Sequence, residues 1–208
     1  MGGSAASAVG GAYAAGLAAG LDARIDDVMR AALEAEATAA GRHLDNIAPS
    51  MLGGLALVRS VDPIDVIRID APQQWAVVLV KPGVQIKTAA ARKILPETWD
   101  RGSWIQQMAN TAALAYAFAA GDAQLVGRAL DDRYAEPLRA PMIPNFAAIK
   151  RAALDAGALG CSISGSGPTI FAITRELDPG VAEAMRSAAG GACDVHVGRI
   201  ARQGARPA

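Results

Sequence analysis

The chain opens with a run, Met1 to Leu21, that carries no charged side chain. Glycine, alanine and serine fill most of this run, and large apolar side chains such as Val9 and Leu17 are few. Alanine and glycine gain too little on transfer to lipid to hold a helix in a membrane, and no basic segment of a secretory signal precedes the run. The run therefore predicts a glycine-rich turn that leads into a buried helix of small residues.

The formal net charge is zero, because 20 basic and 20 acidic side chains are spread over the 208 residues. Such a chain has no field that gathers nucleic acid or an anionic membrane, so we expect neither as a partner. The two cysteines, Cys161 and Cys193, form no CxxC pair, and no closely spaced His or Cys ligands for zinc are present. These features indicate a cytoplasmic protein with reduced thiols.

Strands and helices alternate irregularly along the chain, which favours an α+β fold over a doubly wound sheet. The turn cluster around Asp70-Ala-Pro72 predicts a boundary between residues 1–70 and 71–208, and the second part is expected to be a split βαβ sandwich. The tail from Ala201 is expected to fray. Helices are expected at about 4–21, 23–40 (closed by Gly41), 87–94, 99–120, 123–132, 145–156 and 181–189, strands at about 55–59, 66–69, 74–80, 161–164, 169–174 and 194–200, and a loop at 43–49.

The opening Met1-Gly-Gly-Ser-Ala-Ala-Ser7 places glycines and a serine directly before a helix. Unpaired backbone N–H groups and the positive end of the helix then lie at one point, which suits a phosphate group. An ordinary capped helix start is the alternative. A Walker-type loop is excluded, because the sequence contains no G-x-x-x-x-G-K-[ST].

Glu36, late in a predicted helix, is followed by the polar stretch His43-Leu-Asp-Asn46. This arrangement could hold Mg²⁺ through oxygen ligands and present an amide to a hydroxyl group. Alternatively, Glu36 is a solvated helix charge and Asp45 stabilises its own turn.

Two arginines fall in stretches that could bind an anion. Arg92 lies four residues after Thr88 on a predicted helix, so both share one face. Arg139 ends the stretch Glu136-Pro-Leu-Arg139 in an expected loop. Together the arginines could bind a small carboxylate through paired hydrogen bonds, and surface ion pairing is the alternative for each.

The glycines of Ser164-Gly-Ser-Gly-Pro168 predict either a hairpin turn or a lid against a ligand.

Five stretches together resemble the homoserine kinases, a group within the GHMP family of small-molecule kinases. They occur in that family's order and span nearly the whole chain: MGGSAASAVGG at 1–11, HLDNIAPSMLGGLALV at 43–58, KTAAARKILP at 87–96, EPLRAPMIPNF at 136–146 and GCSISGSGPTIFAI at 160–173. The last stretch alone is typical of the superfamily. The second and third are much more specific to homoserine kinases.

The resemblance implies the GHMP kinase fold. An incomplete ATP-binding domain like domain 2 of ribosomal protein S5 would occupy residues 1–70, and a ferredoxin-like domain would occupy residues 71–208. It also implies a phosphotransferase that moves the γ-phosphoryl group of ATP, with Mg²⁺, to the side-chain hydroxyl of L-homoserine. The product, O-phospho-L-homoserine, serves threonine biosynthesis. ATP and L-homoserine are thus the implied partners, and a homodimer is compatible with the family.

The resemblance also implies a role for particular residues. Its phosphate loop falls on Gly2, Gly3, Ser4, Ala5 and Ser7, and its metal ligands fall on Glu36 and Ser4. Its catalytic amide falls on Asn46, beside Asp45, which is a candidate base with a mainly structural role. Its substrate contacts fall on Thr88, Arg92, Arg139 and Asn46, with both arginines on the amino acid's carboxylate.

Two departures from the family pattern stand out. The chain starts inside the phosphate loop, so strands and an adenine pocket would be missing, and we expect the 208-residue polypeptide alone to be inactive or prone to aggregation. Gly3 also stands where the family has a serine that contacts the metal. The alternatives are another GHMP kinase, acting on mevalonate, a sugar or shikimate, and a non-catalytic binding module of this fold.

Overall fold

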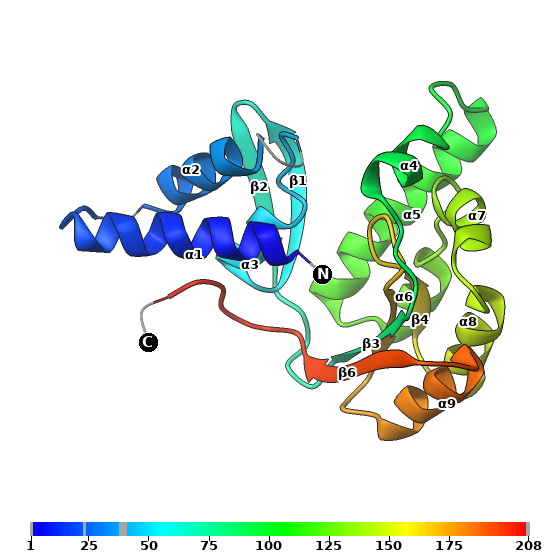
Figure 1. Ribbon diagram of the computed structural model, residues 1–208. Helices are drawn as coiled ribbons and strands as arrows, with labels where there is room; N and C mark the ends of the chain where they lie inside the picture. The colour runs from blue at the N-terminus through cyan, green and yellow to red at the C-terminus, as the bar shows by residue number, and fades with distance from the viewer. Residues whose placement is uncertain (1, 23, 38–40, 207–208) are drawn as a thin grey trace. The chain divides into compact units, whose positions relative to one another are not determined.

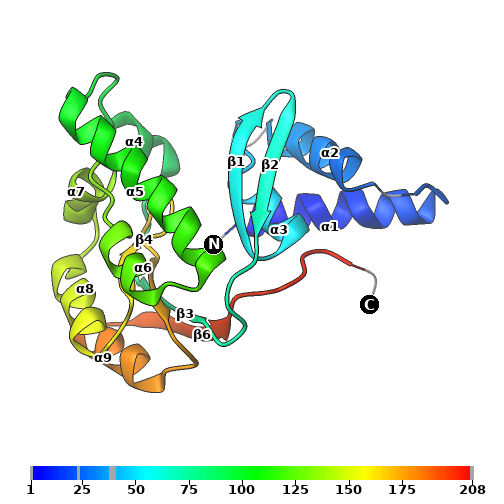
Figure 2. The ribbon, with the colours of Figure 1, turned by 180° about the vertical axis from the view of Figure 1, so that it is seen from behind.

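The computed structural model describes residues 2–22, 24–37 and 41–206, which form two compact units (Figures 1 and 2). The first unit contains the described residues up to Ala71 and those from Ile200 onward, and the second contains Pro72–Arg199. The expected domains, 1–70 and 71–208, place the C-terminal residues in the second part, whereas the residues from Ile200 onward belong to the first unit. The domain bounds stay a prediction. No helix in the described part of the chain combines the length and apolarity needed to cross a bilayer.

The first unit packs three helices with a two-stranded antiparallel sheet. Its elements are α1 (Gly3–Ala18), α2 (Ile25–Ala37), α3 (Ile47–Leu52), β1 (Leu55–Val61) and β2 (Ile64–Ile69). The expected buried helix of small residues is mostly exposed, and its buried residues are Ala5 and Val9. These small side chains let α1 pack closely against α2 and α3. The expected ends of the second helix, Ala23 and Ala40, lie outside the described residues.

In the second unit, helices pack against one four-stranded sheet. Its elements are β3 (Ala76–Pro82), α4 (Thr88–Lys93), α5 (Arg101–Ala120), α6 (Ala123–Ala129), α7 (Glu136–Arg139), a 3₁₀ turn (Ala140–Met142), α8 (Phe146–Asp155), β4 (Gly160–Ile163), β5 (Ile170–Thr174), α9 (Pro179–Ala189) and β6 (Cys193–Arg199). The strand order is β4-β5-β3-β6, and each neighbouring pair is antiparallel. Strands β3 and β4 therefore run in the same direction with β5 between them, which is the expected split βαβ arrangement.

The core of the second unit lies between this sheet and two helices. Alternate residues of β3 (Ala76, Val78 and Val80) are fully buried, as expected of a strand with one face on a core. Helices α8 and α9 lie side by side (Figures 1 and 2). Their buried side chains, including Ile149 and Met185, complete the same cluster.

Three local predictions were wrong. Residues 47–52 form α3, although a loop was expected as far as Pro49; that proline is the third helical residue, where its missing N–H breaks no intrahelical bond. Residues 136–139 form the single turn α7 instead of a loop. The tail does not fray at Ala201, because its carbonyl accepts a 2.7 Å hydrogen bond from Gly54 N.

Candidate functional site

The N-terminus of α1 lies against Asn46. Gly2 caps this helix in a left-handed conformation, with φ 56° and ψ 23°. A Cβ atom at Gly2 would lie 3.0 Å from Asn46 Oδ1. Only glycine takes this conformation at no steric cost, so the sequence Gly2-Gly3 allows the helix start to meet the amide.

A hydroxyl and a carboxylate meet beside the same helix start. Ser4 Oγ donates a 3.2 Å hydrogen bond to Glu36 Oε2, joining the first turn of α1 to the last turn of α2. Both groups are hard oxygen ligands of the type that Mg²⁺ prefers. Within the described residues, no three His, Cys, Asp or Glu side chains gather in a metal-binding cluster.

Other residues predicted for this region take different positions. Ala5 is buried and serves the core, whereas Ser7 is exposed on α1. Gly3 has open space, since a Cβ there would meet no atom within 4 Å. Asp45 and Asn46 are exposed before α3, and the Asn46 side chain makes no capping bond to that helix, although asparagine is a favoured cap.

In the second unit, α4, α7 and the Ser164–Pro168 turn come together around Arg139. Arg139 Nε donates to the carbonyl oxygen of Ala91 at 3.1 Å, and Nη1 donates to that of Gly165 at 2.8 Å. Thr88 Oγ1 lies 3.5 Å from Ser166 Oγ. Arg92 is exposed one helical turn after Thr88. The structure thus gathers the predicted residues Thr88 and Arg139 at one turn.

The Ser164–Pro168 turn is a hairpin between β4 and β5, which confirms one of the two predictions. A role as a lid against a ligand stays a prediction. Ser164 N donates to Thr169 O at 2.8 Å, and Gly165 and Gly167 have φ values of 55° and 78°. A Cβ at Gly167 would lie 2.9 Å from Ile143 Cδ1. The glycines therefore let the turn pack against its own unit while carrying Gly165 O to Arg139.

Glu136 is not a surface charge. Its carboxylate forms an ion pair with Lys150 and accepts a 2.6 Å hydrogen bond from Ser162 Oγ. This network fixes α7 to α8 and β4, three residues before Arg139. Next to it, burial raises the pKa of Cys161 to about 12; Glu136 also raises it, and Lys150 opposes both effects.

The predicted site residues fall in two groups. Gly2, Ser4, Glu36 and Asn46 meet in the first unit, and Thr88, Arg92 and Arg139 belong to the second. Sequence reasoning missed Lys150 and Ser162. No motif marks Lys150, whereas Ser162 lies within the stretch 160–173 that helps to carry the family resemblance. It singled out the turn around Ser166 without assigning that hydroxyl a role, and its place within a glycine-rich turn is the signal that could have done so.

Comparisons with known proteins cover nearly the whole chain. Residues 1–54 match the family described as GHMP kinases N terminal domain, and residues 114–192 match GHMP kinases C terminal. The homoserine kinase of Chlorobaculum tepidum is 44% identical over 99% of this chain and 66% of its own length. That of Chlorobium phaeobacteroides strain BS1 is 41% identical over 99% of this chain and 67% of its own length.

A solved structure agrees with these relatives. The crystal structure of homoserine kinase from Cytophaga hutchinsonii has a TM-score of 0.94 and 39% identity, over 98% of this chain and 67% of that chain. The chain described here thus spans about two thirds of the length of the relatives that it matches.

Proposed function

The chain belongs to the homoserine kinase family of the GHMP kinases, and on that premise we propose that its protein phosphorylates the side-chain hydroxyl of L-homoserine with ATP. The product would be O-phospho-L-homoserine, a step in threonine biosynthesis. The observation that carries the proposal is the contact between Gly2 and Asn46. It brings an anion-binding helix start to within reach of an amide that can orient a hydroxyl group.

The start of α1 would bind the phosphate groups. Its first N–H groups, which include those of Gly3 and Ser4, have no intrahelical acceptor and lie at the positive end of the helix. Ser7 is exposed on the next turn, and Ala5 holds the loop by its burial. Phosphoryl transfer depends mainly on positioning and charge neutralisation, which this geometry supplies.

Ser4 and Glu36 would hold Mg²⁺. Their oxygens are already paired at 3.2 Å, and Mg²⁺ in kinases takes few protein ligands and completes its shell with phosphate oxygens and water. The ion would neutralise charge on the phosphate groups.

Asn46 would orient the homoserine hydroxyl for attack. Its side chain is exposed and does not cap α3, so the amide is available to a substrate. Asp45 is the neighbouring candidate base, although a loose transition state does not require a strong one. We assign Asp45 a mainly structural role.

Thr88, Arg92 and Arg139 would hold the amino-acid part of the substrate. A guanidinium group has five N–H donors, so Arg139 can bind Ala91 and Gly165 and a carboxylate at once. Arg92 would supply the second guanidinium group.

We further propose a cytoplasmic protein that acts on these small molecules without nucleic acid or membrane, and that can form a homodimer.

The test is a coupled assay of ADP release with L-homoserine, mevalonate, galactose and shikimate as acceptors. One sample is the 208-residue chain, which we expect to be inactive alone. The other is the chain joined to the part of the Chlorobaculum tepidum relative that lies outside the match. We expect the joined protein to release ADP with homoserine and to form a phosphate ester visible by ³¹P NMR. A folded joined protein that ignores homoserine, or prefers another acceptor, would refute the proposal.

A further inference from the structure

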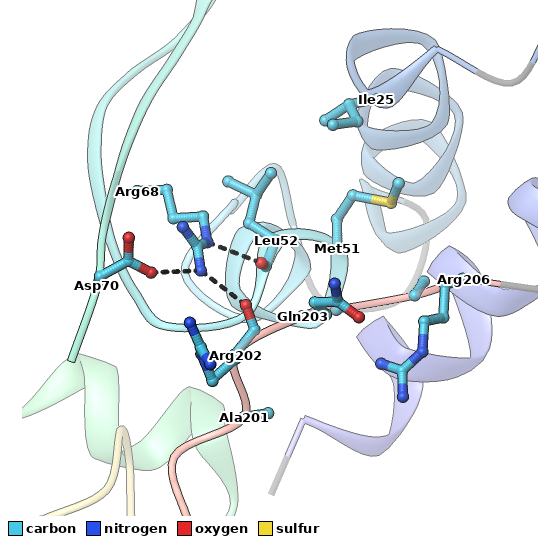
Figure 3. Close-up of a pocket in the computed structure, with 11 residues that line it drawn as sticks. Ile25, Met51, Leu52, Arg68, Asp70, Ala201, Arg202, Gln203 and Arg206 are labelled. Carbon is cyan, nitrogen blue, oxygen red and sulfur yellow. Dashed lines mark hydrogen bonds and ion pairs between the residues drawn. The ribbon is translucent and has the colours of Figure 1, made fainter. Parts of the chain in front are cut away.

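The C-terminal residues 201–205, here termed the C-terminal strap, lie across the end of α3 (Figure 3). Gly54 N donates to the carbonyl of Ala201 at 2.7 Å, just beyond the helix. Ala205 N donates to the carbonyl of Ser50, inside the helix, at 3.0 Å. The strap is therefore bonded on both sides of the C-terminal end of α3.

Arg68 ties the strap to the same helix end. Its Nε donates to the carbonyl of Leu52 at 3.0 Å, and its Nη2 donates to the carbonyl of Arg202 at 2.6 Å. The same Nη2 lies 2.6 Å from Asp70 Oδ1, which holds the guanidinium in place (Figure 3). One side chain from β2 thus joins the last carbonyl of α3 to the strap.

Glycines bring the strap into backbone contact with α3. A Cβ at Gly204 would lie 2.3 Å from the carbonyl carbon and oxygen of Met51. A Cβ at Gly53, which has φ 70°, would lie 2.8 Å from Gln203 N. No side chain fits at either position unless the backbone moves, so these contacts fix how closely the strap lies.

The strap is otherwise open on one side. A hollow of about 990 Å³ lies beside it, lined in part by Ile25, Arg68 and Arg206 (Figure 3). Besides the hydrogen bonds and glycine contacts just described, Ala205 packs against the apolar cluster of the first unit. The contacts made at Gly204 and Arg68 are the ones that single substitutions can remove.

Helix α3 has only six residues, and its buried side chains Ile47, Ala48 and Met51 hold it in the core, whereas its C-terminal carbonyl groups need partners of their own. A helix this short is not stable by itself, and its last carbonyl groups have no intrahelical donors. Of these carbonyls, that of Ser50 is bonded by the strap and that of Leu52 by Arg68. Asn46 precedes the other end of the same helix, less than two turns away.

We propose that the C-terminal strap and Arg68 position Asn46 by fixing α3. Arg68 is then a positioning residue, which acts on the reaction through the helix and touches no substrate. The role in catalysis rests on the proposed function, whereas the hold on α3 does not. Misplacement of a catalytic group by about 1 Å can lower a rate about a hundredfold, so a loosened α3 should lower turnover.

The first experiment measures hydrogen–deuterium exchange of residues 47–54 in the joined protein. Gly204→Ala and Arg68→Ala should each speed exchange there at least about tenfold. The matched controls are Gly198→Ala, where a Cβ meets no atom within 4 Å, and Arg59→Ala, whose ion pair with Asp65 joins β1 to β2. Removal of residues 201–208 repeats the test without a substitution near α3. Exchange as slow as in the controls would overturn the proposal.

The second experiment measures kinetics in the joined protein. We expect Arg68→Ala to lower kcat about ten- to a hundredfold, with the KM for ATP changed less than about twofold, because the phosphate loop is untouched. An unchanged kcat together with faster exchange would overturn the positioning role. A joined protein without homoserine kinase activity would refute the proposed function, and the exchange data would still decide whether the strap holds α3.

Discussion

The carboxylate of Glu136 forms an ion pair with the ammonium group of Lys150, and their side chains are only 12% and 24% exposed. Ser162 Oγ donates to the second carboxylate oxygen at 2.6 Å. None of the residues of α7 is buried, so this network is the main attachment of that single turn to α8 and β4. Arg139 ends the same turn, and its own hydrogen bonds go to the carbonyl groups of Ala91 and Gly165.

We predict strong energetic coupling within this pair. Lys150→Met leaves the carboxylate without its cation and should lower the free energy of unfolding by about 2–3 kcal/mol. The double variant Glu136→Gln, Lys150→Met should lose clearly less free energy of unfolding than the sum of the losses in the two single variants. Urea denaturation followed by tryptophan fluorescence measures this, because all three tryptophans lie in the second unit. Lys81→Met is the control, since its pair with Asp194 is exposed and should change stability by less than about 0.5 kcal/mol. Simple additivity would contradict the prediction.

Arg139→Ala should weaken homoserine binding specifically. Loss of a charge-assisted contact to the carboxylate costs about 2–3 kcal/mol, or roughly 30- to 150-fold in kcat/KM for homoserine. The KM for ATP should stay unchanged, because the phosphate loop belongs to other elements. Steady-state kinetics of the joined protein test this, with Arg151→Ala on exposed α8 surface as the control. Equal losses for both substrates would argue against a carboxylate contact.

Gly2→Ala and Gly3→Ala should have opposite effects. An alanine at position 2 would be strained at φ 56° and would crowd Asn46 Oδ1 at 3.0 Å, so we expect a loss of about 1–2 kcal/mol in stability and a large drop in kcat. Position 3 lies in the first turn of α1, where a Cβ meets no atom within 4 Å. Because alanine favours a helix more than glycine does, this change should raise the free energy of unfolding by up to about 1 kcal/mol. Thermal unfolding and turnover measure both variants. A harmless alanine at position 2 would refute the close contact.

Glu36→Gln should weaken the binding of a divalent cation. The amide has no charge, so the Mg²⁺ concentration for half-maximal rate should rise at least about tenfold. Electron paramagnetic resonance of Mn²⁺ with ATP gives a second readout that does not need turnover. Glu34→Gln is the matched control on the same helix, because Glu34 pairs with Arg42 at 2.6 Å. Identical metal dependence of the two variants would remove Glu36 from the proposed ligands.

The stability of the second unit should fall above pH 9. Burial raises the pKa of Cys161 from its ordinary 9.0 to about 12. Between these two pH values, the Cys161 thiol keeps its proton in the folded chain and loses it in the unfolded chain. This contribution is complete below pH 9 and declines by about 1.4 kcal/mol per pH unit above it. Urea titrations at pH 8 to 10.5 should show a less steep decline for Cys161→Ala. The same decline in both proteins would show that the thiol does not contribute.

The sequence predicted the second unit better than the first. The apolar run of β3 and the glycines of the 164–168 turn are local signals, and they led to the correct strands and hairpin. Helix α3 was missed because six residues that include Pro49 carry too little periodicity to be told from a loop. The bonding of the tail was missed because its partners, Arg68 and Gly54, are far away in the sequence.

The candidate site was predicted mainly through the family resemblance. Residue spacing alone suggested an anion at the start of α1 and an acidic group at Glu36, but did not place Asn46 beside Gly2. That contact depends on how α1 packs on α3, which no local pattern encodes. Surface ion pairing was the alternative for Arg92 and Arg139, and no role was predicted for Glu136. Only the fold reveals its ion pair with Lys150, which lies on another helix.

The bond from Arg68 to the carbonyl of Arg202 spans 134 positions of the chain. A ribosome makes the N-terminal part of a protein first, and domains generally fold in that order during synthesis. Here the first unit cannot complete its folding early, because its final residues are made only after the whole second unit has been translated. Of the two units, the one that is translated first is thus completed last, and a nascent chain halted before position 201 would leave α3 without its C-terminal partner.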